Sequence, residues 1–506
     1  MMEGIGGAGS VWTQLAGCTL SWNATSILAC GFLLWVMYDY FYKDDRNLPP
    51  GPRGLPILGY WPFLGEEHVT YRDLSRTYGP IISVKLGPKR VVVLNDLETI
   101  KEGLTKTSVL YRPDFFFLAR LGIHGIISLN VQAWRDNRRF CLQVLRNLGF
   151  GKRTMDDRIR EECRYLTNVI ATHGGKPINV ADYLAPSVSN NIASLVMGKR
   201  FDFDHPRRRF LDRCLNTILK HANFFYVADF FYCLGTVVRA VSYFGAGKVR
   251  QTADDLKGYF SQVINENKET MTEHEDRNFI DGYLRKIAAQ DGQGSNYNTQ
   301  NLVGNMVNLF GAGTNTVRTT VLWHLLNCAR CPKEVQEKIQ KEIHDVVGSE
   351  RQPGWEDRLK MPFTMAVIWE MYRWKTITPL SVVRGVVEDT EIAGYTIPAG
   401  TPVLANLWAV HMNPDIWKNP EEFNPYRHLS EDGSSLLPKH EHLIPFSTGK
   451  RMCPGETFAT MEVFLYLTSL LQKFTVLPAD GCEVSMEERT NQVTVPALVQ
   501  TLKFIP

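Results

Sequence analysis

The sequence has no dense pattern of cysteines. Its 506 residues include ten cysteines, spread from Cys18 to Cys482, which is unlike the cysteine-rich frameworks of small secreted domains. The CxxC pair Cys328 and Cys331 follows a helix-like run, and neither a second CxxC nor an HxxxH is present to complete a zinc site. We therefore predict reduced thiols in a body that faces the cytosol.

Net charge is also nearly absent. The formal charge is +3, so the whole chain gives no support to nucleic-acid binding, and any basic surface must be local. There is no internal repeat or low-complexity segment. The hydrophobic content of 44% is typical of a folded protein with a large core.

Basic residues are missing from the N-terminal part, where an apolar stretch is present. Residues 20–42 contain no Lys or Arg and one acid, Asp39, and about 20 apolar residues can span a bilayer. The first basic residue, Lys43, follows the stretch, which is the reverse of a cleaved signal peptide and places the later chain in the cytosol. We predict a lumenal segment over 1–19, a single transmembrane anchor over 20–42 and a stiff proline-rich hinge over 43–60.

Residues 61–506 are predicted to form one large, mainly helical α+β domain. Two strands with a turn between them are expected over 81–94, apolar spacing is mostly helical from about 131 to 361, and short β-like runs return over 390–402. This order predicts a small sheet built near the N-terminal side of a helical body. The aromatic segment ANFFYVADFFYC, residues 222–233, has two interpretations: ordinary packing, or a second contact with the membrane surface.

The stretch FSTGKRMCPG surrounds Cys453 with glycine, proline and basic residues. Lys450, Arg451 and backbone N–H groups could compensate a thiolate ligand, and the glycines on either side would let the backbone approach a flat macrocycle. The helix-like run that follows would favour the anion through its dipole. A buried structural thiol is the alternative, and the loop alone leaves both interpretations open.

Three other motifs lie on expected helices. GAGTNTVRTTVLWHLL belongs to a helix-like stretch in which two glycines, and the hydroxyl of Thr316 bonding back to a carbonyl one turn earlier, predict a local opening. EMYR places Glu370 and Arg373 at i and i+3, where a solvated surface pair is the alternative. WRDNRR places Trp134 and Arg138 on one helix face.

Taken together, these motifs resemble the cytochrome P-450 superfamily over essentially the whole chain. Phe446, Gly449, Arg451, Cys453 and Gly455 match its heme-binding loop FxxGxRxCxG. The resemblance implies a cytochrome P-450-type fold and a heme whose iron is bound by the Cys453 thiolate. The sequences of several segments most resemble those of the animal microsomal clan, which includes drug-, steroid- and hormone-oxidising members.

The resemblance also gives the long-helix motif a role with oxygen. Ala312 and Gly313 would lie over the heme, and the Thr316 hydroxyl would handle protons on bound dioxygen. Where the family commonly has an acid, this chain has Asn315. An amide can orient water but cannot ionise, so proton delivery would depend more on Thr316 and ordered solvent.

Further residues acquire roles from the same resemblance. Glu370 and Arg373, with Arg427 from FNPYR, would form a structural network behind the heme that serves folding and cofactor retention. The two carboxylates of the heme attract guanidinium groups, so the resemblance assigns the arginines among the following residues to them. The remaining cofactor-binding residues that it implies are Trp134, Arg138, Arg384, Phe446, Arg451 and Gly455. The substrate pocket would include Phe115, Phe116, Phe117, Ala312, Thr378 and Val382, although ordinary core packing is the alternative for the three phenylalanines.

The activity implied is insertion of one oxygen atom from O₂ into a xenobiotic, steroid or fatty acid. No stretch after residue 460 is typical of a flavin or nicotinamide domain, so electrons are expected from NADPH–cytochrome reductase in the endoplasmic reticulum, with cytochrome b5 as a further partner. The basic residues Arg135, Arg139, Lys152 and Arg153 are either a solvated face or a docking patch. The alternatives are a heme-thiolate isomerase or dehydratase acting on a hydroperoxide without a reductase, and a heme-binding sensor or carrier.

Overall fold

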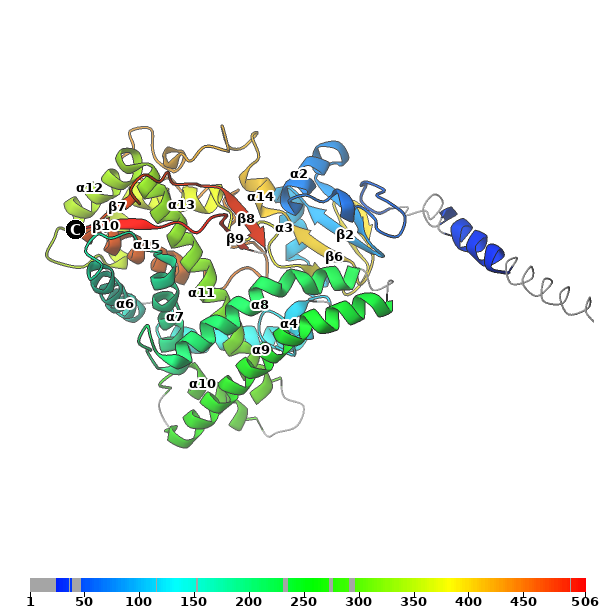
Figure 1. Cartoon of the computed structure of the whole chain (residues 1–506), viewed down its shortest axis with the longest axis horizontal. Coiled ribbons are helices and arrows are strands. Elements are labelled where there is room, and N and C mark those ends of the chain that lie inside the picture. Colours follow the sequence, from blue (N-terminus) through cyan, green and yellow to red (C-terminus); the bar gives the residue numbers. More distant parts are fainter. Residues whose placement is uncertain are drawn as a thin grey trace, which may run out of the picture.

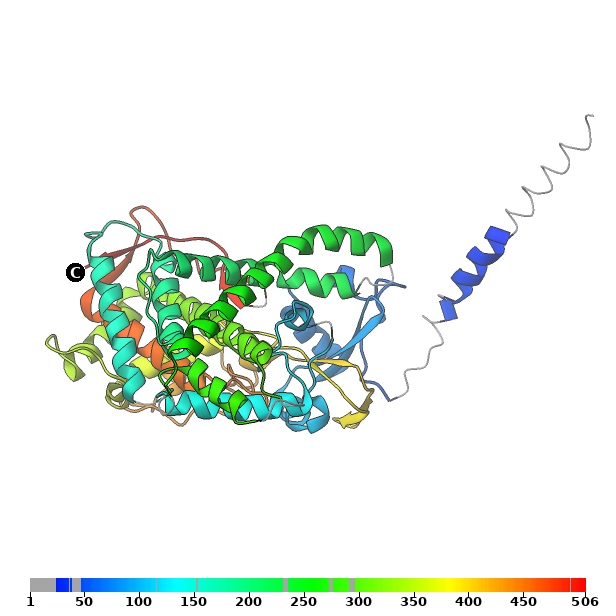
Figure 2. The ribbon, with the colours of Figure 1, turned by 90° about the horizontal axis from the view of Figure 1, so that it is seen from below.

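The structure is a computed structural model, and Figures 1 and 2 show a mainly helical body with a small sheet at one side. It describes residues 24–35, 37–38, 47–114, 116–151, 153–230, 235–272, 276–290, 296–491 and 493–506, without the side chains of residues 219, 222–246 and 491. The predicted fold class, mainly α with small sheets, is confirmed for these residues.

Most of the chain between 131 and 374 is helical, as the apolar spacing predicted. The longer helices are α2 (Glu67–Tyr78), α3 (Leu97–Thr105), α5 (Val131–Asn147), α6 (Arg153–Ala171), α7 (Ala181–Met197), α8 (Pro206–Phe230), α9 (Gly235–Thr270), α10 (Phe279–Ala288), α11 (Thr299–Arg330), α12 (Glu337–Val346), α13 (Pro362–Trp374) and α15 (Glu456–Lys473). The shorter ones are η1 (Trp61–Phe63), η2 (Thr107–Val109), α4 (Phe117–Arg120), η4 (Pro332–Gln336), η5 (Trp355–Lys360), α14 (Leu407–His411) and η6 (Pro425–His428).

The main sheet joins segments from three parts of the chain. β1 (Ile81–Leu86) and β2 (Lys89–Leu94) form the predicted hairpin, and β6 (Pro402–Ala405) pairs parallel with β2. β3 (Arg384–Gly385) pairs antiparallel with β6, which completes the order β1-β2-β6-β3. The two-stranded sheets are β4 (Thr390–Ile392) with β5 (Tyr395–Ile397), β7 (Thr475–Pro478) with β10 (Leu502–Ile505), and β8 (Glu488–Asn491) with β9 (Val493–Pro496).

Helix α11 lies in the centre of the helical body, as both views show. It contacts α7, α9, α13 and α15, and its C-terminal half buries Val317, Val321 and Trp323. Helix α15 buries apolar side chains along its whole length against α6, α11 and α12. Because α15 is held on several sides, the loop directly before it, which contains Cys453, has a fixed position.

The predicted membrane anchor lies only partly within the described residues. Residues 24–35 and 37–38 are helical, and large apolar side chains such as Leu28 and Trp35 are exposed. Among the residues that the structure describes, none of the helices combines the length and the apolar character needed to cross a bilayer. Residues 20–23, 36 and 39–46 lie outside the described residues, as do Phe115, Lys152, residues 231–233 and the side chains of residues 222–230.

Candidate active site

The loop that carries Cys453 folds back on itself before α15. The Cys453 backbone N–H donates to the Phe446 carbonyl at 2.9 Å, and the Gly455 N–H donates to the Cys453 Sγ at 3.4 Å. Gly449 has a left-handed φ of 76°, and a Cβ there would meet the Leu104 carbonyl oxygen at 2.2 Å. Packing against α3 therefore requires a glycine at this position.

The chemistry of the Cys453 thiol depends on its surroundings. Its side chain is accessible to solvent, yet burial is the largest influence on its pKa and raises it; the thiol therefore faces a space enclosed by protein. The Gly455 N–H and the Arg138 charge act in the opposite direction. Metal coordination would deprotonate such a thiol outright.

Guanidinium groups gather beside this loop: those of Arg384 and Arg451 are buried and that of Arg138 is half-buried. Arg138 Nη2 donates to the Met452 carbonyl at 2.6 Å, and Arg384 Nη2 donates to the Arg451 carbonyl at 3.1 Å. Arg451 Nη2 donates to the Leu129 carbonyl at 2.5 Å. Its guanidinium lies over the Trp134 ring, 4.3 Å from the ring centre.

This cluster has more positive charge than the surrounding protein compensates. Burial, followed by the charges of Arg384 and Arg138, lowers the pKa of Arg451 to about 8. Burial and the neighbouring charges of Arg112 and Arg138 likewise lower the pKa of Arg384. Within the described residues, the buried donors Trp134 Nε1, Arg384 Nη1 and Arg451 Nε have no hydrogen-bond partner. Unpartnered donors on crowded cations fit a ligand that carries carboxylates, so the site fits a heme with its two propionates.

Arg112 belongs to the cluster but was not predicted. It is buried, its Nη1 donates to the Val382 carbonyl at 2.8 Å and to that of Val383, and its Nε donates to the Ile127 carbonyl at 2.9 Å. A β-bridge between Tyr111 and Gly385 positions it. The sequence around it, YRPDF, gives no motif that would have identified it.

Helix α11 presents Thr316 as expected, with one difference. Thr316 Oγ1 donates to the Ala312 carbonyl at 2.7 Å, which is the predicted bond one turn back. The helix is nevertheless continuous from Thr299 to Arg330, so the predicted local opening is absent from its secondary structure. Gly313 faces α7, where a Cβ would lie 2.6 Å from Ile192 Cδ1; helix packing by itself therefore favours a glycine here.

A cavity of about 550 Å³ lies against α11. Of the residues predicted to line a substrate pocket, those within the described part of the chain all border it: Phe116, Phe117, Ala312, Thr378 and Val382. Asn315 and Thr316 border it as well, whereas Gly313 does not. Leu215 and Ile218 of α8, together with Val307, Asn308 and Gly311 of α11, are lining residues that the sequence did not indicate.

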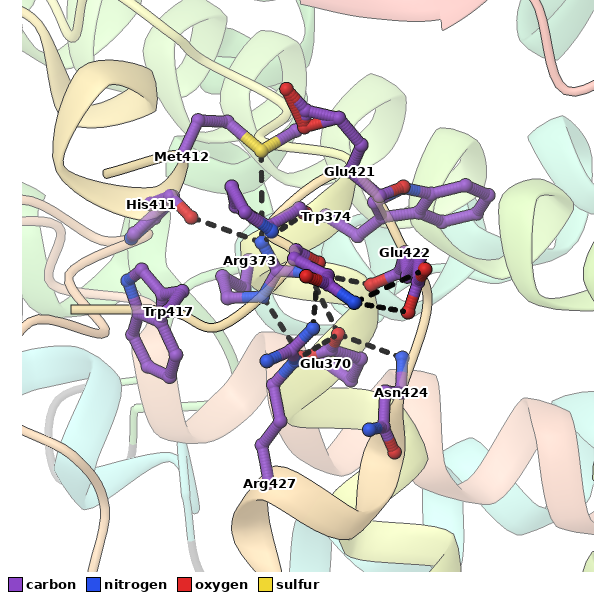
Figure 3. Close-up of polar contacts among 12 residues, drawn as sticks. Glu370, Arg373, Trp374, His411, Met412, Trp417, Glu421, Glu422, Asn424 and Arg427 are labelled. Atoms are coloured by element: carbon purple, nitrogen blue, oxygen red, sulfur yellow. Dashed lines mark hydrogen bonds and ion pairs between the residues drawn. The ribbon is translucent and has the colours of Figure 1, made fainter. Parts of the chain in front are cut away.

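Glu370 is the centre of a buried polar network (Figure 3). Arg373 donates to both of its carboxylate oxygens, at 2.7 and 3.0 Å, and is itself completely buried. Arg427 Nε donates to Glu370 Oε1 at 3.3 Å. The remaining donors of Arg373 bind the carbonyls of His411, Pro420 and Glu422 at 2.7 to 3.0 Å. This pair is therefore no solvated surface pair.

Two histidines in this region were missed by the sequence analysis. His428 Nε2 lies 3.1 Å from Glu370 Oε2; although burial alone would raise the pKa of Glu370, the bonds from His428 and Arg373 hold it below its usual value. His411 Nε2 accepts from the Ile444 N–H at 3.0 Å, so its Nδ1 carries the proton that faces Thr376 Oγ1 at 2.7 Å. His411 thus connects α13 to the segment leading to the cysteine loop.

The remaining predicted residue, Phe446, packs its ring edge-on to Tyr372, with 5.3 Å between the ring centres. A lone cysteine before a helix, a group of arginines with unpartnered buried donors and a mostly apolar cavity beside a helix threonine fit a heme-thiolate protein.

The comparisons with known proteins give the family. The family model described as Cytochrome P450 matches residues 49–504. Cytochrome P450 2J2 of Homo sapiens is 36% identical over 491 residues, covering 95% of this chain and 96% of the relative. Cytochrome P450 18a1 of Drosophila melanogaster is 32% identical over 465 residues, 89% of this chain and 85% of the relative. The chain belongs to the cytochrome P450 family, whose members are monooxygenases that bind heme through a cysteine thiolate.

Proposed function

We propose that the protein inserts one oxygen atom of O₂ into a neutral or weakly polar lipophilic molecule, such as a xenobiotic, steroid or fatty acid derivative. The observation that carries this proposal is the mostly apolar cavity of about 550 Å³ that reaches Ala312, Asn315 and Thr316 on α11. Pockets for small molecules are typically apolar with a few placed polar groups. The heme, when bound, supplies the oxygen activation, as cofactors do in general.

The residues of this chain divide the remaining work. Cys453 would hold the iron, with the Gly455 N–H supporting the sulfur charge. Trp134, Arg138, Arg384 and Arg451 would hold the propionates, and Arg112 would join them. Glu370, Arg373 and Arg427 would fix the segments behind the cysteine loop without touching the reacting atoms.

Proton handling would fall to Thr316 and its neighbour. The Thr316 hydroxyl donates to the Ala312 carbonyl, so it must rotate away from that carbonyl before it can donate into the cavity. Asn315 can orient a water molecule there but cannot supply a proton itself. The alternative of hydroperoxide isomerisation draws support only from this asparagine.

Electrons would come from NADPH through a separate reductase, with cytochrome b5 as a further partner. Of the basic residues predicted for a docking patch, Arg135, Arg139 and Arg153 are exposed. Lys450 is exposed as well, on the cysteine loop that the bond from Arg138 to Met452 joins to α5. A basic surface there suits an acidic partner. We further propose a lumenal segment over 1–19, an anchor over 20–42, a hinge over 43–60 and a cytosolic catalytic domain over 61–506 at the endoplasmic reticulum.

Oxygen uptake tests the reaction. The full-length, heme-loaded protein, given the reductase, NADPH and a panel of lipophilic compounds, is expected to consume O₂ and to form a product heavier by one oxygen atom. Labelled O₂ should place its label in that product. Conversion of hydroperoxides alone, with no uptake of O₂ on any compound, would mean that the alternative is correct.

A further inference from the structure

One carboxylate that borders the cavity takes no part in the proposed reaction. Glu67 is the first residue of α2, and it lines the cavity of about 550 Å³. The residue is exposed to solvent, yet burial raises the pKa of its carboxyl group. A side chain that is accessible and at the same time surrounded by protein faces an enclosed space, as the Cys453 thiol does. The accessible surface of Glu67 therefore belongs to the cavity.

No positive charge among the described residues compensates Glu67. None of them forms an ion pair with it, and those that line the cavity include no Lys or Arg. His68 follows it directly, but burial lowers the pKa of His68 to about 4, so this ring is uncharged at neutral pH. Burial, followed by the charge of Glu67, raises the pKa of the Tyr71 phenol one turn along the helix. The field of the carboxylate thus reaches the buried wall of the cavity without a cation to balance it.

The start of a helix allows an unpaired acid at this position. The partial positive charge at the N-terminus of α2 favours a carboxylate in the first turn. This effect falls off within that turn, so it stabilises the ionised form of Glu67 without neutralising the charge for a molecule farther into the cavity. The preceding residue, Glu66, also lines the cavity. Its side chain is 52% exposed, so solvent screens its charge more strongly.

The charged end of the cavity is separate from the end where oxygen would react. Helix α2 packs on β1 of the main sheet, whereas Ala312 and Thr316 line the cavity from α11, in the helical body. Figure 1 shows α2 and α11 in these different parts of the molecule. A substrate that fills the cavity and is oxidised at α11 would therefore place its remote end near Glu67.

We propose that Glu67 sets the charge selectivity of the cavity: it rejects free carboxylic acids and accepts neutral lipids whose remote end donates hydrogen bonds. This inference rests on the proposed function and narrows its substrate class, because free fatty acids are excluded and their neutral derivatives remain. Two like charges repel several times more strongly in an enclosed site than in water. A hydroxyl or N–H group can instead donate to the Glu67 oxygens. Selectivity of this kind comes from the repulsive group as much as from the attractive one.

Ligand binding to the heme-loaded, full-length protein tests the proposal without turnover. Dissociation constants for dodecanoate and dodecanamide are measured from the change in heme absorbance at neutral pH. The two molecules have nearly the same shape, but the amide is uncharged and donates hydrogen bonds. The wild type is expected to bind the amide at least about tenfold more tightly than the acid. An acid that binds as tightly as the amide would overturn the proposal.

Substitution of Glu67 separates the effect of its charge from the ordinary hydration of the acid. Glu67→Gln keeps the size of the side chain and removes its charge. This variant should bind dodecanoate at least about tenfold more tightly than the wild type does, and dodecanamide no more tightly. An unchanged affinity for dodecanoate in this variant would contradict the proposal, even if the wild type prefers the amide.

Two other acids of the same segment are controls. Asp73 lies on α2, is not among the lining residues and pairs with Arg72 at 2.8 Å, so Asp73→Asn should leave both affinities unchanged. Glu66→Gln should give a smaller gain for dodecanoate than Glu67→Gln, because solvent screens the Glu66 charge. An equal gain in Asp73→Asn would reveal an effect of net charge alone and refute a specific role for Glu67, and so would a gain confined to Glu66→Gln.

The outcome is separable from that of the proposed function. If O₂ uptake and product formation are observed while Glu67→Gln binds the acid no better, only the selectivity assigned to Glu67 is wrong. If the selectivity follows Glu67 but O₂ is never consumed on any compound, the charge selectivity stands and the monooxygenase reaction falls. The carbon-monoxide spectrum of each variant shows whether its heme site has folded.

Discussion

At the scale of single residues, the proposed role of Cys453 as the iron ligand can be tested by substitution. We expect Cys453→Ser to lose the carbon-monoxide band of the reduced protein from which the family takes its name, because a hydroxyl is a much poorer ligand than a thiolate. Cys482→Ser serves as the control, since that thiol is exposed and lies far along the chain from the loop. A normal band in Cys453→Ser would show that another residue binds the iron.

His324 on α11 predicts a pH dependence of stability. It is buried, neither ring nitrogen has a partner within the described residues, and burial lowers its pKa from 6.5 to about 3. Below pH 6.5 the His324 side chain binds a proton in the unfolded chain, whereas in the native state it stays neutral down to about pH 3. Stability therefore falls as the pH drops through this window.

The substitution His324→Leu should remove that contribution. Between about pH 6.5 and 3, we expect the number of protons taken up on urea unfolding to fall by up to one, so that the free energy of unfolding depends less steeply on pH. At neutral pH we expect the free energy of unfolding to rise by about 1 kcal/mol, because an unsatisfied polar side chain is replaced by an apolar one. His411 is the comparison, since its pKa is also lowered to about 3 but its ring is hydrogen-bonded. An unchanged pH slope in His324→Leu would contradict the prediction.

At the scale of elements, α11 packs in the core of the helical body, and we propose that it also supplies the Thr316 hydroxyl to the reaction. Thr316→Ala should uncouple the reaction, so that NADPH is consumed while product formation falls by at least about tenfold. A positioned proton-transfer group usually raises the rate roughly 10²–10⁴-fold, and we expect the smaller loss because water can replace part of the relay. Thr316→Ser keeps the hydroxyl and should restore most of the product. The ratio of product to NADPH measures the effect, and an unchanged ratio in Thr316→Ala would exclude a role for this hydroxyl.

The buried network around Glu370 joins two elements, α13 and η6. Arg373→Ala would leave the buried Glu370 carboxylate without its main partner. We expect this change to lower the free energy of unfolding by about 3–5 kcal/mol. We expect little heme-loaded protein from this variant. Arg427→Ala should be milder, because its one bond to Glu370 is longer, at 3.3 Å. Equal heme content in wild type and Arg373→Ala would show that the network is dispensable.

The elements were largely predictable, whereas several contacts between them were not. Apolar spacing predicted the β1–β2 hairpin and the helices because burial of one face repeats along the chain. The partnerships of Arg112, His411 and His428 depend on segments that meet only in three dimensions, and no local pattern encodes them. The contact between Gly313 and Ile192 was not predictable for the same reason, since the two residues are far apart in sequence.

At the scale of the whole molecule, the exposed basic residues of α5 and the cysteine loop predict salt-sensitive electron delivery. Replacing Arg135, Arg139 and Lys450 with glutamine should lower reductase-supported turnover several-fold at low salt. The difference between wild type and variant should shrink as salt is added, because the electrostatic screening length is only about 10 Å at 0.1 M salt and shortens further above that. Turnover driven by a hydroperoxide needs no reductase and is the control. A parallel loss of both activities would point to a folding defect instead.

The arginine cluster also has a consequence for how the molecule is assembled. Arg384 is a residue of β3, and Arg112 follows the bridge from Tyr111 to Gly385, so the edge of the main sheet and the proposed propionate site share residues. Burial and the neighbouring guanidinium groups disfavour the charged forms of Arg384 and Arg451, so an anion bound beside them is expected to stabilise this edge. Binding of heme would then stabilise the sheet edge together with the site, and the folded fraction of the chain is expected to rise with the supply of heme.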